Sequence, residues 1–232
     1  MNDHIGFSDI LSRSNLFAGI EEKKLSGIVD LGHRRVLESG VTLFREGDPA
    51  LQSYLVLRGR LKLSKLHEDG KEVIVRYIEP GQITAAVSVF NEKDYPATAQ
   101  AAGPSEVVGW DRETMMELMT AHPRLAINML RAAVERLDDL QSRYLEMSAE
   151  RVEQRIAKAL LRIMTQSGRK TDEGILIDFR LSRQDLADYT GTTLFTVSRT
   201  LSNWEKKGWI ASGRERIVVV DPHALVAFAE AG

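Results

Sequence analysis

Residues 182–216 constrain the fold of this chain more than any other part of its sequence. Ala187 is the small residue that a helix-turn-helix needs where its two helices touch, Gly191 stands at the turn, and Val197 supplies a branched apolar side chain that faces the core. This spacing predicts a helix-turn-helix whose second helix is shaped to enter the major groove of DNA.

Capping signals place the ends of both predicted helices. Ser182 is a typical N-cap residue, and Asp185 follows three positions later, as in a capping box. The second helix is expected from about Thr193 to about Lys207, because Gly208 then ends it.

Two β-rich runs, residues 209–210 and 216–220, follow the second helix. Residues 212–215 lie between them, so the pattern predicts a short hairpin with a basic tip, the wing of a winged helix-turn-helix. The alternative is an ordinary helical pair packed beside a hairpin. The helix spacing and the wing together disfavour that alternative.

Composition limits what else the chain can be. Its 232 residues suffice for two domains, and the lack of cysteine excludes disulfides and cysteine-ligated iron–sulfur clusters. No apolar run approaches the roughly 20 residues of a membrane span, and the N-terminus does not resemble a secretory signal, so we expect a cytoplasmic protein with no membrane partner. The net charge is −2, but residues 149–232 carry 13 Lys and Arg against 11 Asp and Glu, a small basic excess.

Glycine-punctuated β-rich runs dominate residues 28–110. Many short strands with regular turns indicate a jelly-roll barrel, a double-stranded β-helix, rather than a parallel sheet with crossover helices. Residues 7–16 and 21–28 are expected to be helical, which makes the fold class α+β. The expected strands are residues 41–44, 54–57, 60–66, 72–78, 97–101 and 107–110, with Gly47, Gly59, Gly70 and Gly81 at or near the turns.

A long helix is predicted next, because residues 125–147 contain no glycine or proline. Apolar residues at alternating steps of three and four favour a parallel coiled-coil dimer, although an amphipathic helix lying on its own barrel is an open alternative. The predicted dimer seam is Leu130, Ala133, Leu137, Leu140, Tyr144 and Met147. The expected domains are an effector-sensing barrel over residues 1–120, a dimerisation helix over 121–148 and a DNA-binding domain over 149–232.

The order of these parts resembles the Crp/Fnr family, the cAMP receptor protein and FNR regulators of bacterial transcription. Residues 44–48 and 54–59 are similar to the barrel signature of that family, and residues 181–187 and 196–199 to its DNA-binding half. The resemblance implies a cyclic-nucleotide-binding-like barrel in a homodimer that binds a palindromic operator in double-stranded DNA. It also implies RNA polymerase as a partner and no enzymatic activity.

The resemblance also implies roles for residues in the DNA-binding half. Arg199 matches the family arginine that binds guanine through a bidentate fork, whereas Phe195 replaces a glutamate that accepts a hydrogen bond from cytosine. Positions 182–184 match residues that contact the DNA backbone, and the wing arginines add phosphate contacts. The candidate DNA-binding residues are Ser182, Arg183, Gln184, Thr193, Phe195, Thr196, Ser198, Arg199, Arg214 and Arg216.

The effector is a different matter, since members that bind cAMP carry Gly-Glu, Arg-Ser and Thr-Ser pairs where this chain has residues 85–86, 96–97 and 140–141. A buried phosphate needs a guanidinium or several donors, and this run offers none, so we expect no cAMP binding. The residues form either an apolar effector pocket or simple core packing. The candidate pocket residues are Ala85, Ala86, Val87, Pro96, Ala97 and Leu140.

Haem is a candidate effector because residues 94–101 are similar to those of the dissimilatory nitrate respiration regulators, which sense nitric oxide through haem. The five histidines show no spacing typical of a metal site, and His4, His33 and Met115 are weak candidates for an axial ligand. A regulator that binds DNA without an effector, its barrel serving as a dimer scaffold, is an alternative. A cupin-type enzyme is a remote one, because we expect neither metal-ligating nor catalytic residues.

Overall fold

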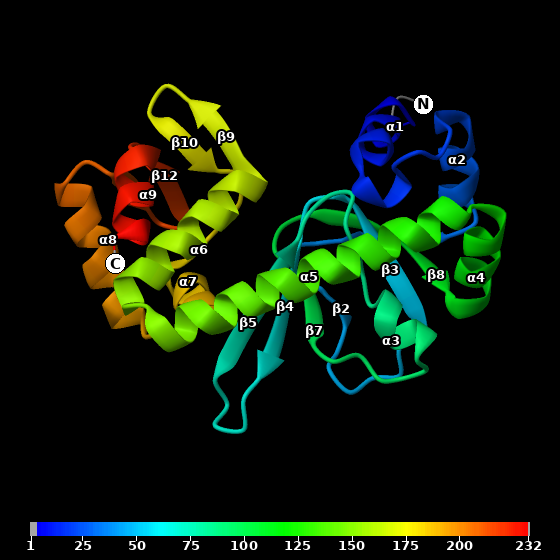
Figure 1. Cartoon of the computed structure of the whole chain (residues 1–232), viewed down its shortest axis with the longest axis horizontal. Helices are drawn as coiled ribbons and strands as arrows, with labels where there is room; N and C mark the ends of the chain where they lie inside the picture. The colour runs from blue at the N-terminus through cyan, green and yellow to red at the C-terminus, as the bar shows by residue number, and fades with distance from the viewer. Residues whose placement is uncertain (1–3, 232) are drawn as a thin grey trace. The chain divides into compact units, whose positions relative to one another are not determined.

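The structure is a computed structural model that describes residues 4–231. Contacts divide it into two compact units, shown in Figure 1. The first unit comprises the residues up to 65 together with residues 76–140, and the second comprises residues 66–75 together with the residues from 141 onward. Within residues 4–231, no helix is both long and apolar enough to cross a membrane.

Two four-stranded sheets form the body of the first unit, with strand orders β1-β8-β3-β6 and β2-β7-β4-β5. Strand β3 pairs antiparallel with β8 on one side and with β6 on the other. Gly59 follows β3 with a φ of +71°, and a Cβ there would lie 2.3 Å from the Pro104 carbonyl oxygen, so the turn requires glycine. The strands are β1 (His33–Leu37), β2 (Thr42–Phe44), β3 (Gln52–Arg58), β4 (Leu61–Leu66), β5 (Glu72–Ile78), β6 (Ile83–Thr84), β7 (Thr98–Ala101) and β8 (Ser105–Asp111).

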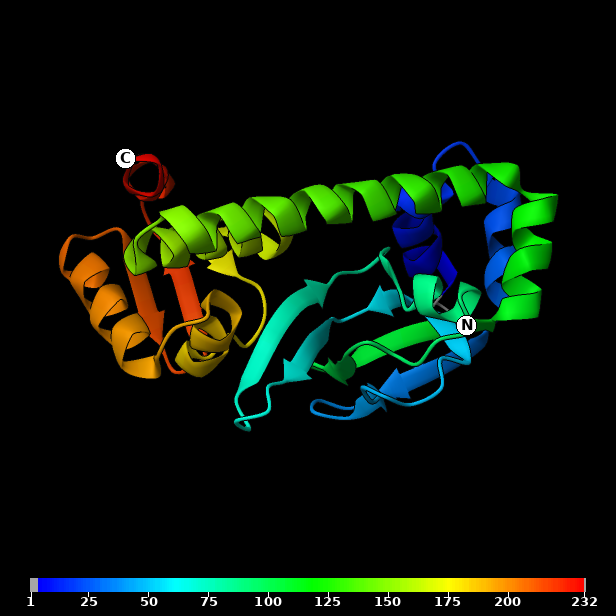
Figure 2. The ribbon, with the colours of Figure 1, turned by 60° about the horizontal axis from the view of Figure 1, so that its bottom comes forward.

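Helices of the first unit pack against one of its sheets in one buried cluster. Leu25 and Ile28 of α2 share a buried cluster with Met115 of α4, and Figure 2 shows these elements together. Trp110 of β8 belongs to the same cluster, and its indole N–H donates to the Ile28 carbonyl oxygen at 2.9 Å. The helical elements are α1 (His4–Arg13), η1 (Asn15–Phe17), α2 (Glu22–Asp30), α3 (Ala86–Phe90), α4 (Arg112–Ala121) and α5 (Pro123–Ala149).

Stacked aromatic rings fill a second core cluster. The ring of Phe44 lies 3.9 Å from that of Tyr95 and 5.8 Å from that of Tyr54, measured between centroids. The Tyr95 hydroxyl donates to the Gln52 carbonyl oxygen at 2.9 Å, and burial raises the pKa of Tyr95 to about 12. The phenol therefore stays neutral, and the rings act as packing.

The predicted strands are all present in this unit, but four of its elements were missed. Strand β1 buries only Leu37 of its five residues, so it shows none of the apolar alternation that marks a half-buried strand. Strand β6 is two residues long, and α3 and α4 are short helices beside strong β signals. The sequence therefore predicted the central strands, but it missed the edge strands β1 and β6 and two short helices.

Helix α5 runs for 27 residues, slightly beyond the predicted 125–147. Only Leu125 and Asn128 of its described side chains are buried. The Asn128 amide donates to the carbonyl oxygens of Leu16 and Ala18, both at 2.9 Å, which fastens the start of the helix to η1. Met129 is half-buried against the core cluster, and most of the apolar side chains beyond it on α5 are exposed in this single chain.

The second unit contains the predicted winged helix-turn-helix. Its antiparallel sheet has the order β11-β12-β10-β9, and the loop between β11 and β12 consists of residues 214–215 alone, two fewer than expected. Strand β10 ends two residues before the predicted 175–179, and α9 was not predicted. The elements are α6 (Val152–Ser167), β9 (Gly168–Thr171), β10 (Gly174–Ile177), α7 (Arg183–Thr190), α8 (Leu194–Lys206), β11 (Ile210–Gly213), β12 (Arg216–Val219) and α9 (Pro222–Glu230).

Candidate nucleic-acid interface

Helix α8 is anchored along one face and presents the other to solvent. Val197, Leu201 and Trp204 are buried at steps of four and three residues. The ring of Trp204 meets that of Phe228 edge to face at 5.7 Å and lies 6.4 Å from that of Trp209. These contacts fix the rotation of α8 about its own axis, and this determines which of its side chains face solvent.

Helix α7 begins and ends as the sequence predicts. The Ser182 hydroxyl accepts a hydrogen bond from the Asp185 backbone N–H at 2.9 Å, and the Asp185 carboxylate accepts one from the Ser182 N–H at 3.1 Å. Gly191 ends the helix with a φ of +65°, a left-handed conformation that favours glycine. The capping box and the glycine together set the turn into α8.

The outward face of α8 carries the predicted base-contacting residues. The ring of Phe195 is 74% exposed, Arg199 is also exposed, and Ser198 is half-buried. Thr193 has a different role, because its hydroxyl accepts from the Thr196 backbone N–H at 3.1 Å and lies 2.9 Å from the Thr196 hydroxyl. These two threonines cap the helix and so order its first turn.

An open hollow of about 490 Å³ lies beside this face. It brings together the start of α7, the start of α8 and the tip of the wing. A helix N-terminus with an adjacent guanidinium attracts anions, so this hollow suits a DNA phosphate. Its lining residues are Ser182, Arg183, Gln184, Leu194, Gly213, Arg214 and Glu215, which include four of the predicted contact residues.

Two residues that the sequence did not single out hold Arg183 in place. The Arg183 guanidinium donates to the Ser212 hydroxyl at 3.0 Å, and that hydroxyl donates to the Glu205 carboxylate at 2.6 Å. The Ser212 backbone N–H also donates to Glu205, at 2.9 Å. This chain joins α7, the wing and the end of α8, and no local sequence pattern announces contacts between residues 29 positions apart.

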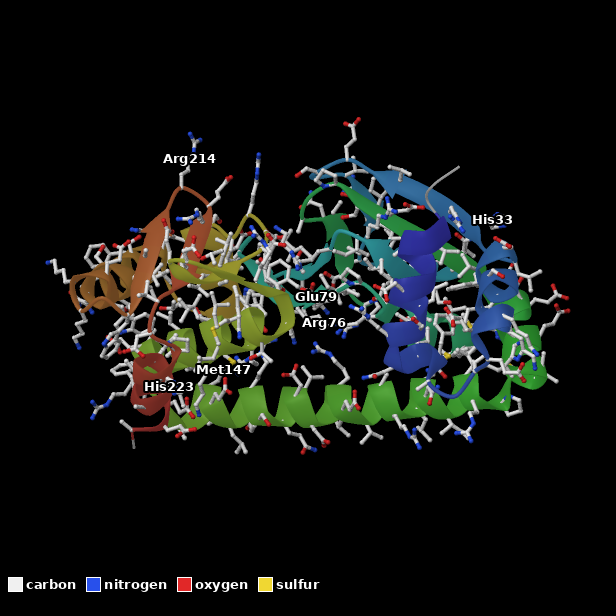
Figure 3. The ribbon with its side chains drawn as sticks, turned by 90° about the horizontal axis from the view of Figure 1, so that it is seen from above. His33, Arg76, Glu79, Met147, Arg214 and His223 are labelled. Carbon is white, nitrogen blue, oxygen red and sulfur yellow. The ribbon has the colours of Figure 1, made fainter. Side chains whose placement is uncertain are left out.

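The two wing arginines differ in their surroundings. Figure 3 shows Arg214 pointing outward from the tip of the wing. Arg216 donates to the Glu173 carboxylate at 2.7 Å, and both side chains are about half exposed or more. Exposed pairs of this kind contribute little to stability, so a DNA phosphate can replace Glu173 as the partner of Arg216.

The candidate effector residues differ in burial. Ala86 and Ala97 are buried, whereas Val87 is 64% exposed, Leu140 is 43% exposed and Pro96 is also exposed. None of the six lines the hollow beside α8 or a second open hollow along α4. Burial therefore varies within this set, and its role as a pocket stays a prediction.

Ala85, the sixth member of that set, has a strained backbone. Its φ is +64°, the left-handed conformation, at the N-cap of α3. A residue with a Cβ adopts this conformation at a cost, and glycine does not.

The candidate haem ligands whose side chains the structure describes, Met115 and His33, lie in different surroundings. Met115 is 1% exposed and packed among apolar side chains, and His33 lies on the surface of β1, as Figure 3 shows. The side chain of His4 lies outside the described residues. Among the described side chains, no group of three or more His, Cys, Asp or Glu is placed to hold a metal ion. Neither Met115 nor His33 lines the hollow beside α8 or the open hollow along α4.

Comparison with known families covers most of the chain. A cyclic nucleotide-binding domain model matches residues 34–122, and a Crp-like helix-turn-helix domain model matches residues 154–228. The structure of FixK2 from Bradyrhizobium japonicum has a TM-score of 0.76 at 23% identity and covers 87% of this chain and 98% of that one. This likeness supports the architecture of barrel, long helix and helix-turn-helix.

Similar sequences have regulatory names. The chain is 30% identical over 190 residues to the global nitrogen regulator of Synechococcus elongatus, which covers 81% of this chain and 86% of that protein. It is 24% identical over 219 residues to the CRP-like cAMP-activated global transcriptional regulator of Mycobacterium tuberculosis, covering 94% of this chain and 97% of that protein. These relatives are transcription regulators rather than enzymes. The chain belongs to the Crp/Fnr family of DNA-binding transcription regulators.

Proposed function

We propose that this protein is a homodimeric regulator that binds a palindromic operator in double-stranded DNA, acts through RNA polymerase, and takes an effector other than cAMP. The observation that carries the proposal is the surface around the open hollow beside α8. It joins the base-facing side of α8 to Arg183 and Arg214. That combination supplies both phosphate contacts for positioning and base contacts for specificity.

An exposed apolar stripe on α5 supports the homodimer. In the single chain Leu130 is 66% exposed, Leu137 54% and Tyr144 72%. Ile127 precedes Leu130 by three residues, and Val134 lies four residues after Leu130 and three before Leu137. Each is 51% exposed, and both were missing from the predicted seam. A second copy of the same stripe would bury all of them, as in a parallel coiled coil.

The apolar character of the candidate pocket supports an effector other than cAMP. The Ala85–Ala86 and Pro96–Ala97 pairs stand where relatives offer charged or hydroxyl groups to the ribose and phosphate. An unpaired phosphate buried against such residues would lose its hydration without compensation. Adding cAMP should therefore leave the affinity for DNA unchanged, and a saturable micromolar effect would overturn this part of the proposal.

A regulator without any effector is a second candidate, and the stacked rings favour it. Phe44, Tyr54 and Tyr95 fill the core of the barrel with side chains, as a scaffold would. Titration of the apo-protein with haem, followed by DNA binding with and without nitric oxide, separates the candidates further. A stoichiometric Soret shift that changes DNA affinity would support haem as the effector.

The dimer itself is tested with Leu137→Glu in the full chain. We expect the wild-type protein to sediment as a dimer, and the variant to sediment as a monomer with weaker binding to an operator selected from random duplexes. Glu135→Lys, a charge change at an exposed position off the stripe, is the control and should stay dimeric. A variant that remains dimeric at micromolar concentration would contradict the proposed seam.

A further inference from the structure

Two large apolar side chains are exposed at the first turn of α8. Phe195 is 74% exposed and Leu194 is 46% exposed, whereas the other large apolar residues of this helix are buried. Apolar rings on the surface of a domain stabilise nothing unless something covers them. On a helix that enters the major groove, the covering surface is DNA.

Phe195 and Arg199 lie on the same side of α8, one helical turn apart. The Arg199 guanidinium carbon is 6.0 Å from the centroid of the Phe195 ring, at the outer limit of a cation–π contact. The capping threonines before and after Phe195 order the backbone of this turn. The ring and the guanidinium therefore approach DNA as a pair.

The chemistry of the pair restricts the bases that it can recognise. A guanidinium fork matches O6 and N7 of guanine, and this is the commonest base contact of arginine. A phenyl ring offers no acceptor to cytosine N4 and no donor to any base edge. The apolar group that the major groove exposes is the 5-methyl group of thymine.

We infer that Phe195 and Arg199 together read a two-base-pair step, in which a 5-methylpyrimidine, thymine in ordinary DNA, stands next to the guanine that Arg199 binds. This inference rests on the proposed function, and it concerns the base preference of the same surface. It means that the half-site differs from that of relatives with glutamate at this position, because a methyl contact replaces a hydrogen bond to cytosine.

The test uses the full-length dimer and an operator selected from randomised duplexes. The thymine beside the essential guanine is replaced by deoxyuridine, which removes only the methyl group. We expect affinity to fall roughly fourfold for each methyl removed, the value of one buried methyl or methylene group. Placing 5-methylcytosine at the same position, paired with guanine, should recover part of the loss relative to cytosine.

Variants assign the effect to the ring. Phe195→Ala, at an exposed position, should bind thymine and deoxyuridine duplexes equally while keeping its dependence on the guanine. Phe195→Glu should shift the preference toward cytosine. Leu194→Ala is the neighbouring control and should keep the difference between thymine and deoxyuridine.

The outcomes separate this inference from the proposed function. If no duplex is preferred over random DNA, sequence-specific binding fails and the base step fails with it. If an operator is selected and 7-deazaguanine at its guanine weakens binding, but deoxyuridine has no effect, then only the methyl contact is overturned. A methyl effect that persists in Phe195→Ala also overturns the assignment to Phe195.

Discussion

The recognition surface of the second unit and the candidate effector region of the first differ in how their predicted residues are exposed. Four of the DNA-binding residues line one hollow, and others share the outward face of α8. The effector candidates divide between buried and exposed positions. A helix presents neighbours three and four residues apart on one side, whereas a pocket needs side chains from distant strands to converge.

The largest expected effect is on DNA affinity, when Arg199 is removed from the recognition surface. Arg199→Ala should lower the affinity for a selected operator by about tenfold to a hundredfold for each half-site, because a bidentate contact with guanine contributes roughly 1–3 kcal/mol. Fluorescence anisotropy with operator and random duplexes measures both affinities. Binding to random DNA should change far less.

Lys206→Ala provides the control for Arg199→Ala, since it removes a positive charge from the exposed last turn of the same helix. It should weaken operator and random duplexes alike. If Arg199→Ala behaves in the same way as this control, Arg199 contacts phosphate rather than a base.

The second prediction concerns the barrel as a scaffold. The Arg60 guanidinium donates two hydrogen bonds to Glu79, both at 2.7 Å, and their side chains are 11% and 9% exposed. Glu79→Ala should destabilise the first unit by about 3 kcal/mol, because it leaves a buried guanidinium without its carboxylate. Amide hydrogen exchange of β3 and β8 reports this loss locally.

The exposed pair of Arg112 and Glu92, at 3.1 Å, offers a matched control. Glu92→Ala should change the free energy of opening that the same amide exchange reports by less than about 0.5 kcal/mol, since exposed pairs contribute little. Equal effects of Glu79→Ala and Glu92→Ala would show that burial does not distinguish the two pairs.

A smaller effect is expected from the contacts that position Arg183. Ser212→Ala removes the hydroxyl between Arg183 and Glu205, so binding to all duplexes should weaken about threefold to tenfold. The dependence of affinity on salt should also become shallower, by up to about one phosphate contact per half-site. Ser202→Ala, at a half-buried position of α8, should leave the salt dependence unchanged. If the salt dependence of affinity is unaltered in Ser212→Ala, Ser212 contributes only to packing.

The smallest expected effect is a change in stability at Ala85, in the candidate effector region. Ala85→Gly should stabilise the barrel by about 0.5 kcal/mol, because relief of the left-handed backbone outweighs the greater freedom of glycine in the unfolded chain. Hydrogen exchange of β6 and β3 measures the gain. A destabilised variant would mean that the methyl group of Ala85 contributes more by packing than its backbone costs.

Local signals made much of the recognition surface predictable. The capping box at Ser182 and the left-handed Gly191 act within four residues, so the sequence alone shows them. The pairing of Arg60 with Glu79 and the link from Asn128 to Leu16 join residues 19 and 112 positions apart. Such contacts depend on the finished fold, and residue type and spacing do not reveal them.

The tryptophans of this protein lie in two separate optical environments. Trp110 is sealed in the barrel, and its indole N–H is held by the Ile28 carbonyl oxygen. Trp204 lies on the buried face of α8, and Trp209 follows that helix. Both rings are next to Phe228. Replacing Trp110 by phenylalanine leaves a fluorescence signal that comes from the recognition domain alone, and the complementary pair of substitutions leaves one that comes from the barrel alone. A ligand that enters the barrel and an operator bound to α8 can thus be followed independently, without any attached dye.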